Sequence, residues 1–314
     1  MEAILERRKD DSRCQESWGT LLSTSTASRH PQRGKVAIMQ YGLDIPINGA
    51  YAHVRTLADL AAEAEEAGWD GFFLQDVLFS TEPIVDPWVA LAAVALRTER
   101  LRIGVFLTPL PRRRPWQVAR QAVTIDHLSN GRLIFGAALG FQALDFTPFG
   151  EDYTPSTRAE KLDEGLEIVQ GLWSGEAFSF HGTHYHLEHV TFLPKPLQSP
   201  RIPIWVAGGW PHKKPLRRAA RWDGIYLMTV NQVTGALLTP EEIREIVAYV
   251  RTYRTSSAPF DVAVNGELSS DVHQKAELVQ MYEAAGATWW VEYEAPSSSF
   301  EEYRARIRQG PPRG

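Results

Sequence analysis

The chain has 314 residues, 44% hydrophobic and 11% aromatic, so it is long enough to bury one large α/β core. Its formal net charge of −5 argues against a general binder of nucleic acid or anionic membranes, because such proteins concentrate Lys and Arg. The single cysteine, Cys14, excludes an internal disulfide framework and a cysteine-rich metal site, and it favours a reducing, cytoplasmic location. No stretch approaches the roughly eighteen consecutive apolar residues of a membrane-spanning helix.

The beginning of the chain differs in composition from the rest. Residues 1–34 mix both charges with Ser and Thr, and they lack the apolar centre of a signal peptide. We therefore expect residues 1–38 to be a disordered leader, or the product of a start assigned too early. Residues 39–314 are predicted to form the folded domain.

From residue 35 onward, short apolar or β-branched runs alternate with longer amphipathic segments, as in βα units around a parallel sheet. The eight predicted strands are 39–45, 71–75, 101–106, 132–138, 203–208, 224–228, 261–265 and 288–293. The eight predicted helices are 55–67, 87–97, 115–128, 156–172, 213–221, 240–253, 271–285 and 299–309. This rhythm favours an α/β fold of the (β/α)8 TIM-barrel type over a doubly wound sheet, whose first strand would precede a glycine fingerprint.

One segment interrupts the alternation. Residues 175–200 alternate aromatic and polar residues around His181-Gly182, which predicts a β-hairpin insertion before the fifth strand. Within it, His184 and His186 are expected to share a strand face, and three such ligands could hold zinc. We favour an exposed hairpin without metal, because no residues in the sequence are seen to orient the rings or to complete the geometry.

Active sites of (β/α)8 barrels lie at the C-terminal ends of the strands. The predicted strand ends carry Asp44, Asn48, Gln75, Asp76, Thr108, Gly140, Phe141, Gly208, Gly209, Trp210, Met228, Asn265, Glu292 and Tyr293. These positions offer neither a Ser–His–Asp nor a Cys–His arrangement, and Asp44 and Asp76 lack a strand-end histidine with which to bind a metal. Small and aromatic residues with a few polar groups suit a flat, largely apolar ligand with one anionic end, such as a flavin.

Several of these positions allow two interpretations. Gly208-Gly209 precedes a helix, so its N–H groups either face a phosphate or form a tight βα turn. The three arginines at 112–114 indicate either a bound anion or a solvated basic loop, and Arg158 has the same ambiguity. Asp76 either binds cofactor or substrate, or caps its own loop.

The segment DHLSNGR (126–132) belongs to an αβ turn, at the barrel face remote from the strand ends. Its Asn-Gly pair predicts a left-handed turn. We expect Asp126 and Arg132 to tie helix to strand. Gly140, a few residues later, reaches the opposite rim, where the absence of a side chain would let a cofactor approach.

The segment TPLPRRRPWQVARQAVTIDHLSNGRLIFGAALGF (108–141) closely resembles the third helix and fourth strand of luciferase-like monooxygenases, the bacterial-luciferase superfamily. Further matches occur in order at 39–51, 57–73, 86–104, 158–176, 202–209 and 310–313. The resemblance implies a barrel that binds reduced FMN or the deazaflavin coenzyme F420 at the mouth of the strands. FMN members oxygenate substrates with O2, commonly with a separate NAD(P)H flavin reductase, whereas deazaflavin members transfer hydride. Family members often form homodimers, and no feature of the sequence itself sets an oligomeric state.

The resemblance also implies where the cofactor lies. In such relatives the turn after the third strand backs the isoalloxazine ring, and glycines after the fourth and fifth strands approach the phosphate. The predicted cofactor-binding residues are Phe106, Leu107, Thr108, Gly140, Arg158, Gly208, Gly209 and Trp210. Asp44 and Asp76 are the catalytic candidates, and no metal is expected. Many relatives have Asp-His at the end of the second strand where this chain has Asp76-Val77, which puts chemistry that needs the histidine in doubt.

We therefore predict a flavin-dependent oxidoreductase, foremost a monooxygenase that uses reduced FMN and O2 on a small hydrophobic substrate. The alternatives are an F420-dependent hydride-transfer enzyme, a non-catalytic flavin-binding protein, and a sugar-phosphate isomerase barrel that uses Asp44 and Asp76. Tyr51, Phe79 and Trp210 indicate an apolar or aromatic substrate. The substrate pocket is expected from the loops at 46–52, 77–85, 209–214 and 229–239.

Overall fold

The computed structural model describes residues 39–228, 238–267, 272–293 and 299–313. By its contacts the chain divides into residues 1–37 and residues 38–314, and the fold is that of the second unit. The predicted leader and most of the 229–239 loop lie outside the described residues, so both remain predictions. None of the described helices is at once long and apolar enough to cross a lipid bilayer.

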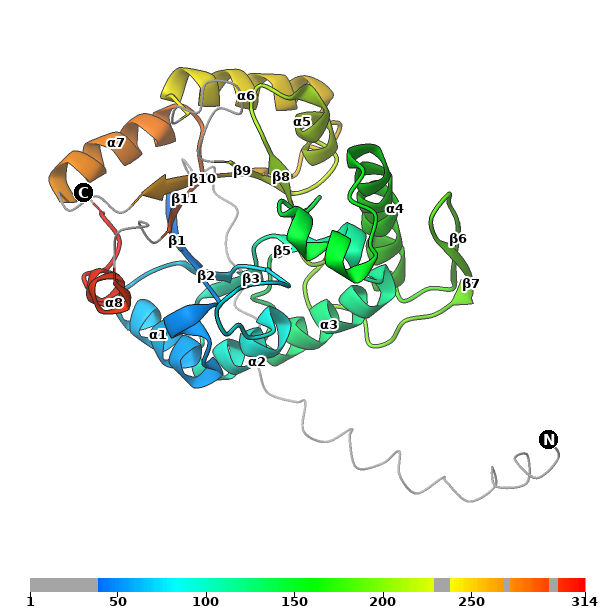
Figure 1. Ribbon diagram of the computed structural model, residues 1–314. Coiled ribbons are helices and arrows are strands. Elements are labelled where there is room, and N and C mark those ends of the chain that lie inside the picture. Colours follow the sequence, from blue (N-terminus) through cyan, green and yellow to red (C-terminus); the bar gives the residue numbers. More distant parts are fainter. Residues whose placement is uncertain (1–38, 229–237, 268–271, 294–298, 314) are drawn as a thin grey trace, which may run out of the picture. The chain divides into compact units, whose positions relative to one another are not determined.

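A parallel sheet closes almost completely into a barrel (Figure 1). In the described residues its order is β3-β2-β1-β11-β10-β9-β8-β5-β4, and the remaining seam is bridged by the pair Ile103–Leu133. The predicted (β/α)8 barrel is therefore confirmed. The strands are β1 (Gln40–Ile45), β2 (Gly71–Leu74), β3 (Arg102–Val105), β4 (Thr108–Pro109), β5 (Phe135–Ala138), β8 (Ile204–Gly208), β9 (Gly224–Leu227), β10 (Asp261–Glu267) and β11 (Trp289–Tyr293).

The helices surround the barrel, and each predicted helix has a counterpart (Figure 1). Local sequence explains their starts: Asp86 accepts a hydrogen bond from the Val89 N–H, and Thr239 and Ser299 each form a capping box. The helices are α1 (Val54–Glu66), α2 (Pro87–Arg97), α3 (Pro115–Leu128), α4 (Pro155–Trp173), α5 (Lys213–Ala219), α6 (Pro240–Tyr253), α7 (Val272–Ala284) and α8 (Phe300–Arg308). Proline at the first turn of α2, α3, α4 and α6 costs no backbone hydrogen bond there.

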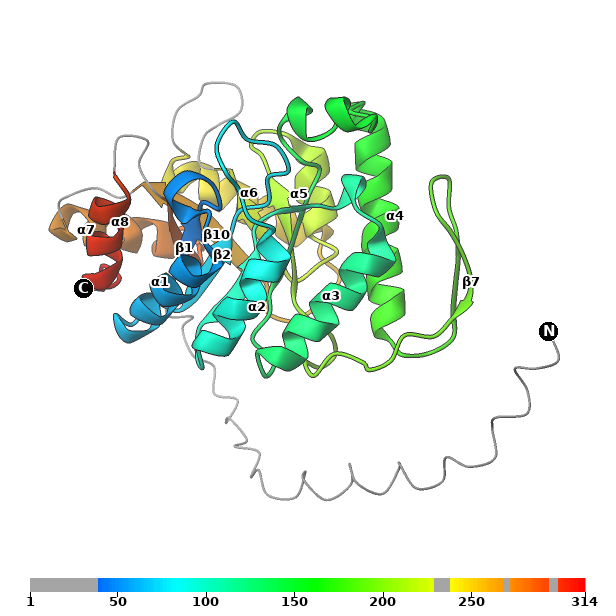
Figure 2. The ribbon, with the colours of Figure 1, turned by 60° about the horizontal axis from the view of Figure 1, so that its bottom comes forward.

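Between α4 and β8 the chain leaves the barrel. It forms an antiparallel pair, β6 (Phe178–His181) and β7 (His186–Val190), which lies on the outer side of α4 (Figures 1 and 2). Phe180 stands opposite Leu187 in this pair, and the buried Leu187 belongs to the main hydrophobic core. One face of the hairpin is thereby fixed to the barrel, and the other faces away from it.

The interior of the barrel is filled by its own aromatic cluster. Phe73 and Phe106 stack with ring centroids 3.9 Å apart, and Trp205 and Trp289 pack around Phe73. Tyr226 meets the Phe106 ring edge-on at 5.3 Å. Because large aromatic side chains bury extensive apolar area, this cluster stabilises the barrel.

The end of the chain packs against its first βα unit. The indole N–H of Trp69 donates to the Ile307 carbonyl at 2.8 Å, and the Tyr41 hydroxyl donates to the Pro312 carbonyl at 3.4 Å. The guanidinium of Arg313 bonds Asp70 at 2.7 Å. Residues 307–313 therefore complete the packing around β1 and the turn after α1.

Candidate active site

A cavity of about 430 Å3 opens at the C-terminal ends of the barrel strands. Its volume falls in the range of small-molecule and cofactor sites, and its position is that of barrel active sites in general. Its lining comes from the ends of β1, β2, β3, β5, β8, β9 and β10, represented by Asp44, Gln75, Phe106, Ala138, Gly208, Tyr226 and Asn265. The aromatic cluster inside the barrel forms its floor, because Phe106 and Tyr226 belong to both.

Asp44 is the most unusual group of this cavity. Its Oδ2 accepts a hydrogen bond from the Tyr226 hydroxyl at 2.9 Å, while its buried Oδ1 has no hydrogen-bond partner among the described residues. Burial raises the pKa of Asp44 to about 6, against the opposing effect of hydrogen bonds from Tyr226 and Gln75. A carboxyl group with such a pKa exchanges a proton near neutral pH, which suits a general acid or base.

Tyr226 takes part in the same polar group. Burial and the neighbouring Asp44 raise the pKa of Tyr226 well above its usual value, so the phenol keeps its proton. The amide of Asn265 lies against it and also lines the cavity, and the Asn265 Oδ1 has no partner among the described residues. Two buried acceptor atoms are therefore available to a bound molecule at this side of the cavity.

Asp76 has a different environment from Asp44. Its carboxylate accepts hydrogen bonds from Arg112 at 2.5 Å and from Arg113 at 2.8 Å, and its side chain is fully buried. Of the two interpretations of the arginine run, a bound anion or a solvated basic loop, Arg112 and Arg113 match the first, but their anion is an aspartate of the protein itself. Because both Asp76 oxygens are engaged, this residue is poorly placed to exchange protons with a substrate, and an isomerase that pairs Asp44 with Asp76 is not favoured.

The loop after β5 forms one wall of the cavity. Gly140 lines it with a φ of +85°, which L side chains rarely adopt. Arg158 donates to the Gly140 carbonyl at 2.7 Å and to the Tyr153 carbonyl at 3.1 Å, and its guanidinium lies 3.8 Å from the centre of the Tyr153 ring. Arg158 thus stabilises the loop after β5 through these contacts, and it does not itself line the cavity.

Most of the predicted site residues meet at this cavity. Those that line it are Asp44, Asp76, Phe106, Leu107, Gly140, Gly208 and Gly209. Thr108, Arg158 and Trp210 are outside the lining. Thr108 is fully buried in β4, and Trp210 is covered by the Lys213 ammonium at 3.8 Å from its ring.

The residues predicted to bind substrate are dispersed. Tyr51 is buried against Phe300, with ring centroids 5.1 Å apart, and lines no part of the cavity. Phe79 is partly exposed and lines a second hollow of about 320 Å3, which shares Val77 with the cavity. Of the three predicted aromatic residues, Phe79 is therefore the one beside the cavity mouth.

Sequence reasoning missed two residues that shape the site. Tyr226 stands between the apolar Ile225 and Leu227, so strand alternation could have identified it as the inward-facing polar tip of β9. Asp145 accepts hydrogen bonds from the backbone N–H groups of Leu78 and Phe79, both at 3.0 Å, and so joins two loops at the mouth. No local sequence pattern predicts that Asp145 joins these two loops.

The sequence model of luciferase-like monooxygenases matches residues 28–311 of this chain. The chain belongs to the luciferase-like monooxygenase family. The resemblance seen in the sequence is thereby confirmed. Proteins similar to this chain include monooxygenases and F420-dependent enzymes.

Individual relatives show both kinds of chemistry. The luciferase-like protein is 33% identical over 186 residues to an uncharacterized protein of Mycobacterium tuberculosis, a match that covers 58% of this chain and 60% of that one. It is 32% identical over 163 residues to an F420-dependent glucose-6-phosphate dehydrogenase of Nakamurella multipartita, covering 49% of this chain and 47% of that enzyme. The match thus spans about half to three fifths of the length of these curated relatives.

A solved structure supports the same fold. The oxygenating constituent of 3,6-diketocamphane monooxygenase from the CAM plasmid of Pseudomonas putida, a type II Baeyer–Villiger monooxygenase in complex with FMN, superposes with a TM-score of 0.69. The two chains are 13% identical, and the superposition covers 87% of this chain and 96% of that one. At this identity the likeness shows the barrel fold alone.

Proposed function

We propose that the luciferase-like protein is a flavin-dependent monooxygenase that uses reduced FMN and O2 on a small hydrophobic substrate. The observation that carries this proposal is the lining of the cavity, which is mostly apolar and contains no histidine among the described residues. Val77 lines it at the position where the resemblance associates a histidine with deazaflavin chemistry. Oxygenation requires fewer acidic and basic side chains than deazaflavin chemistry does, because flavin and O2 supply the reacting groups.

The residues present fit a flavin. The apolar floor of Phe106 and Leu107 suits the face of a flat heterocycle, and Gly208 and Gly209 also line the cavity. The free acceptor atoms of Asp44 and Asn265 suit polar hydrogens at its edge. When bound, reduced FMN would supply two electrons for splitting O2, so that a substrate RH gives ROH while the second oxygen atom leaves as water.

The chain's own residues would contribute exclusion of water and control of one proton. The buried aromatic floor closes the inner end of the cavity to water, which would limit hydrolysis of bound groups. Asp44 holds or releases a proton at Oδ1 near neutral pH, and Tyr226 fixes the orientation of that carboxyl group through its hydrogen bond to Oδ2.

The mouth of the cavity supports a hydrophobic substrate. Phe141 lines the cavity and is 79% exposed, while Phe79 and Leu144 line the adjoining hollow. Asp145 holds the two loops that carry these side chains. Exposed apolar side chains gathered at a cavity mouth are typical of ligand-binding surfaces for apolar compounds.

The test is a titration of the purified protein with FMN and with F420, each oxidised and reduced, followed by turnover. We expect reduced FMN to bind, and oxygen uptake with a separate flavin reductase to yield hydroxylated or otherwise oxygenated product from an apolar substrate panel. A matched variant, Val77→His, should bind FMN as well as the unmodified protein does. Binding of F420 alone, or of neither cofactor, would overturn the proposal, and binding of FMN without any product would favour a non-catalytic flavin carrier.

F420-dependent hydride transfer is the second candidate, and the pKa of Asp44 is the observation that favours it. Reduction of a carbonyl group requires a hydride from the cofactor and a proton for the oxygen, and a carboxyl group with a pKa of about 6 can provide that proton. Reduced F420 would then be oxidised at the rate of alcohol formation without any oxygen uptake. Loss of this activity in Asp44→Asn, with F420 affinity retained, would distinguish it from oxygenation.

A further inference from the structure

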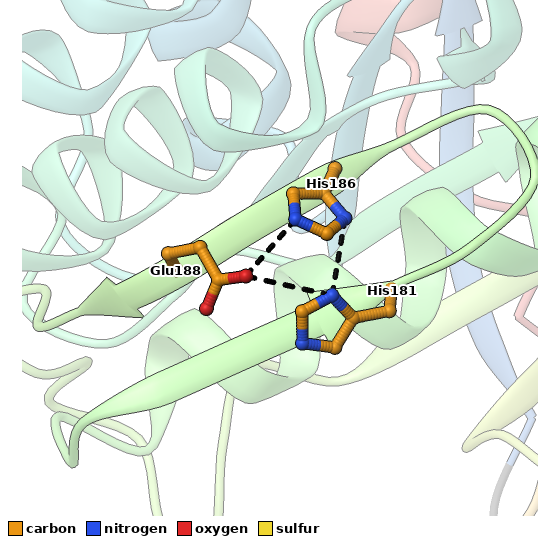
Figure 3. A group of neighbouring side chains, drawn as sticks. All are labelled: His181, His186 and Glu188. Atoms are coloured by element: carbon orange, nitrogen blue, oxygen red, sulfur yellow. Dashed lines mark hydrogen bonds and ion pairs between the residues drawn. The ribbon is translucent and has the colours of Figure 1, made fainter.

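The solvent face of the outer hairpin brings together three metal-ligating side chains, His181, His186 and Glu188 (Figure 3). The Nδ1 atoms of the two histidines are 3.0 Å apart. Glu188 Oε1 lies 3.6 Å from His181 Nδ1 and 3.0 Å from His186 Nε2. All three side chains are exposed, so their donor atoms are open to a cation from solution.

Strand geometry explains why these residues meet. His181 is the direct cross-strand partner of His186, and Glu188 follows His186 by two residues, so all three share one face of the pair. The sequence had instead predicted that His184 and His186 would share a face. His184 belongs to the turn between the strands, and its Nε2 contacts Glu160 of α4 at 2.9 Å.

The turn that joins the two histidines is firmly attached to α4. The carboxylate of Glu164 accepts hydrogen bonds from the backbone N–H groups of Thr183, His184 and Tyr185, at 2.7, 3.0 and 3.1 Å. At Gly182 any side chain would place its Cβ 2.4 Å from Glu164 Oε2, so glycine permits this approach. The hairpin face that carries His181, His186 and Glu188 is thus fixed by contacts of the turn, and these three side chains take no part in them.

We propose that His181, His186 and Glu188 form a binding site for one zinc-like divalent cation. Imidazole nitrogen and carboxylate oxygen bind Zn2+ at about 2.0–2.2 Å, which separates neighbouring ligand atoms of a tetrahedron by about 3.3–3.5 Å. Each histidine gives a metal only one ring nitrogen, and with one donor atom from each residue the three donors lie within 4.8 Å of one another. Rotation of these exposed side chains can bring the donors to tetrahedral spacing. Three protein ligands leave the fourth position to water.

Two nitrogen ligands also set the kind of cation. Imidazole favours Zn2+, Ni2+ and Cu2+, whereas Mg2+ and Ca2+ prefer sites made of oxygen atoms. The site lies on the outer side of α4, apart from the barrel strands whose ends form the cavity (Figure 1). It is therefore independent of the proposed flavin chemistry, and its test needs no turnover.

The experiment is calorimetric titration of the full chain, freed of metal by chelation, with ZnCl2 and then with MgCl2. We expect one Zn2+ per chain and no measurable Mg2+ binding. Each of His181→Ala, His186→Ala and Glu188→Gln should weaken Zn2+ binding by about tenfold or more, since a ligand is lost. Titration with Co2+ should give the intense visible absorption of a four-coordinate ion, lost in the same variants.

His53→Ala is the matched control, because His53 is exposed and lies outside the hairpin. It should bind Zn2+ with unchanged affinity. The three ligand positions are at the surface, so unchanged melting temperatures should show that the variants fold. Zn2+ binding that persists unchanged in His186→Ala, or the absence of saturable binding to the unmodified chain, would overturn the proposal.

Discussion

Two groups of buried polar atoms, one at each end of the barrel, have opposite hydrogen-bonding environments. At the N-terminal end, the guanidinium of Arg132 donates all five of its N–H groups in hydrogen bonds of 2.7–2.9 Å. The acceptors are the Thr98 hydroxyl and the backbone carbonyls of Ala95, Thr98, Leu101 and Ser129. At the C-terminal end, buried oxygens of Asp44 and Asn265 have no partner among the described residues. Saturation stabilises a fold, whereas free acceptors are available to a ligand.

Asp126 repeats the pattern of the N-terminal end. Its carboxylate accepts the backbone N–H groups of Leu197 and Gln198 at 2.7 and 3.2 Å and the Gln198 side-chain amide at 2.7 Å. It therefore fixes the entry to β8 against the end of α3. The expectation that Asp126 and Arg132 tie helix to strand agrees with these contacts, although each also reaches a neighbouring βα unit.

The largest expected effect comes from breaking the saturated end. Arg132→Ala should lower the free energy of unfolding by about 3–4 kcal/mol, because five buried acceptors lose their donors. Urea denaturation measures this loss. The control Arg97→Ala removes an exposed pair with Asp59 and should cost less than about 1 kcal/mol. Equal losses in the two variants would contradict the contrast between buried and exposed arginines.

At the opposite end, removing a charge should stabilise the protein. The folded state raises the Asp44 pKa from 3.8 to about 6, so it binds more protons than the unfolded chain between these values. The contribution of Asp44 to the free energy of unfolding therefore falls as pH rises from about 4 to 6, and the total decrease is ~3 kcal/mol. Asp44→Asn should match the unmodified protein near pH 4 and exceed it by up to ~3 kcal/mol at pH 7.5.

Denaturant titrations of both proteins across this pH range test the prediction, since other titrating groups cancel in the difference. A constant difference between them at all pH values would show that Asp44 keeps an ordinary pKa. Activity should move the other way, because Asn cannot hold an exchangeable proton in the same manner. Increased stability with lost turnover is the expected outcome for a group retained for function.

The smallest expected effect compares two glycines. Gly131→Ala at the N-terminal end has a φ of +79° and only the Gln198 side chain nearby, at 3.5 Å, so it should cost about 1–2 kcal/mol of stability. Gly140→Ala has a φ of +85° and places its Cβ 2.6 Å from the Phe146 ring, so the cavity wall must move. Cofactor affinity should fall about tenfold in Gly140→Ala alone, because a loss of about 1.4 kcal/mol of binding free energy is a tenfold change. Equal affinities in both variants would contradict a role for this loop.

The sequence was sufficient for the parts of the molecule that depend on local patterns. Apolar periodicity and caps located the eight helices and every described strand of the barrel except the two-residue β4, and the strand ends located the cavity. Pairings between distant residues could not be predicted in this way. Asp76 meets Arg112 across 36 residues and Tyr226 meets Asp44 across 182, and no local signal specifies either partner.

The contacts of residues 307–313 with the first βα unit also concern the order of events during synthesis. Trp69, Tyr41 and Asp70 are made early, yet their partners Ile307, Pro312 and Arg313 follow 238 to 271 residues later. β1 likewise cannot form its parallel pairing with β11 until β11 has been synthesised. A growing chain thus exposes the unpaired edge of β1 until β11 has been synthesised, and such unpaired edges make nascent chains prone to aggregation.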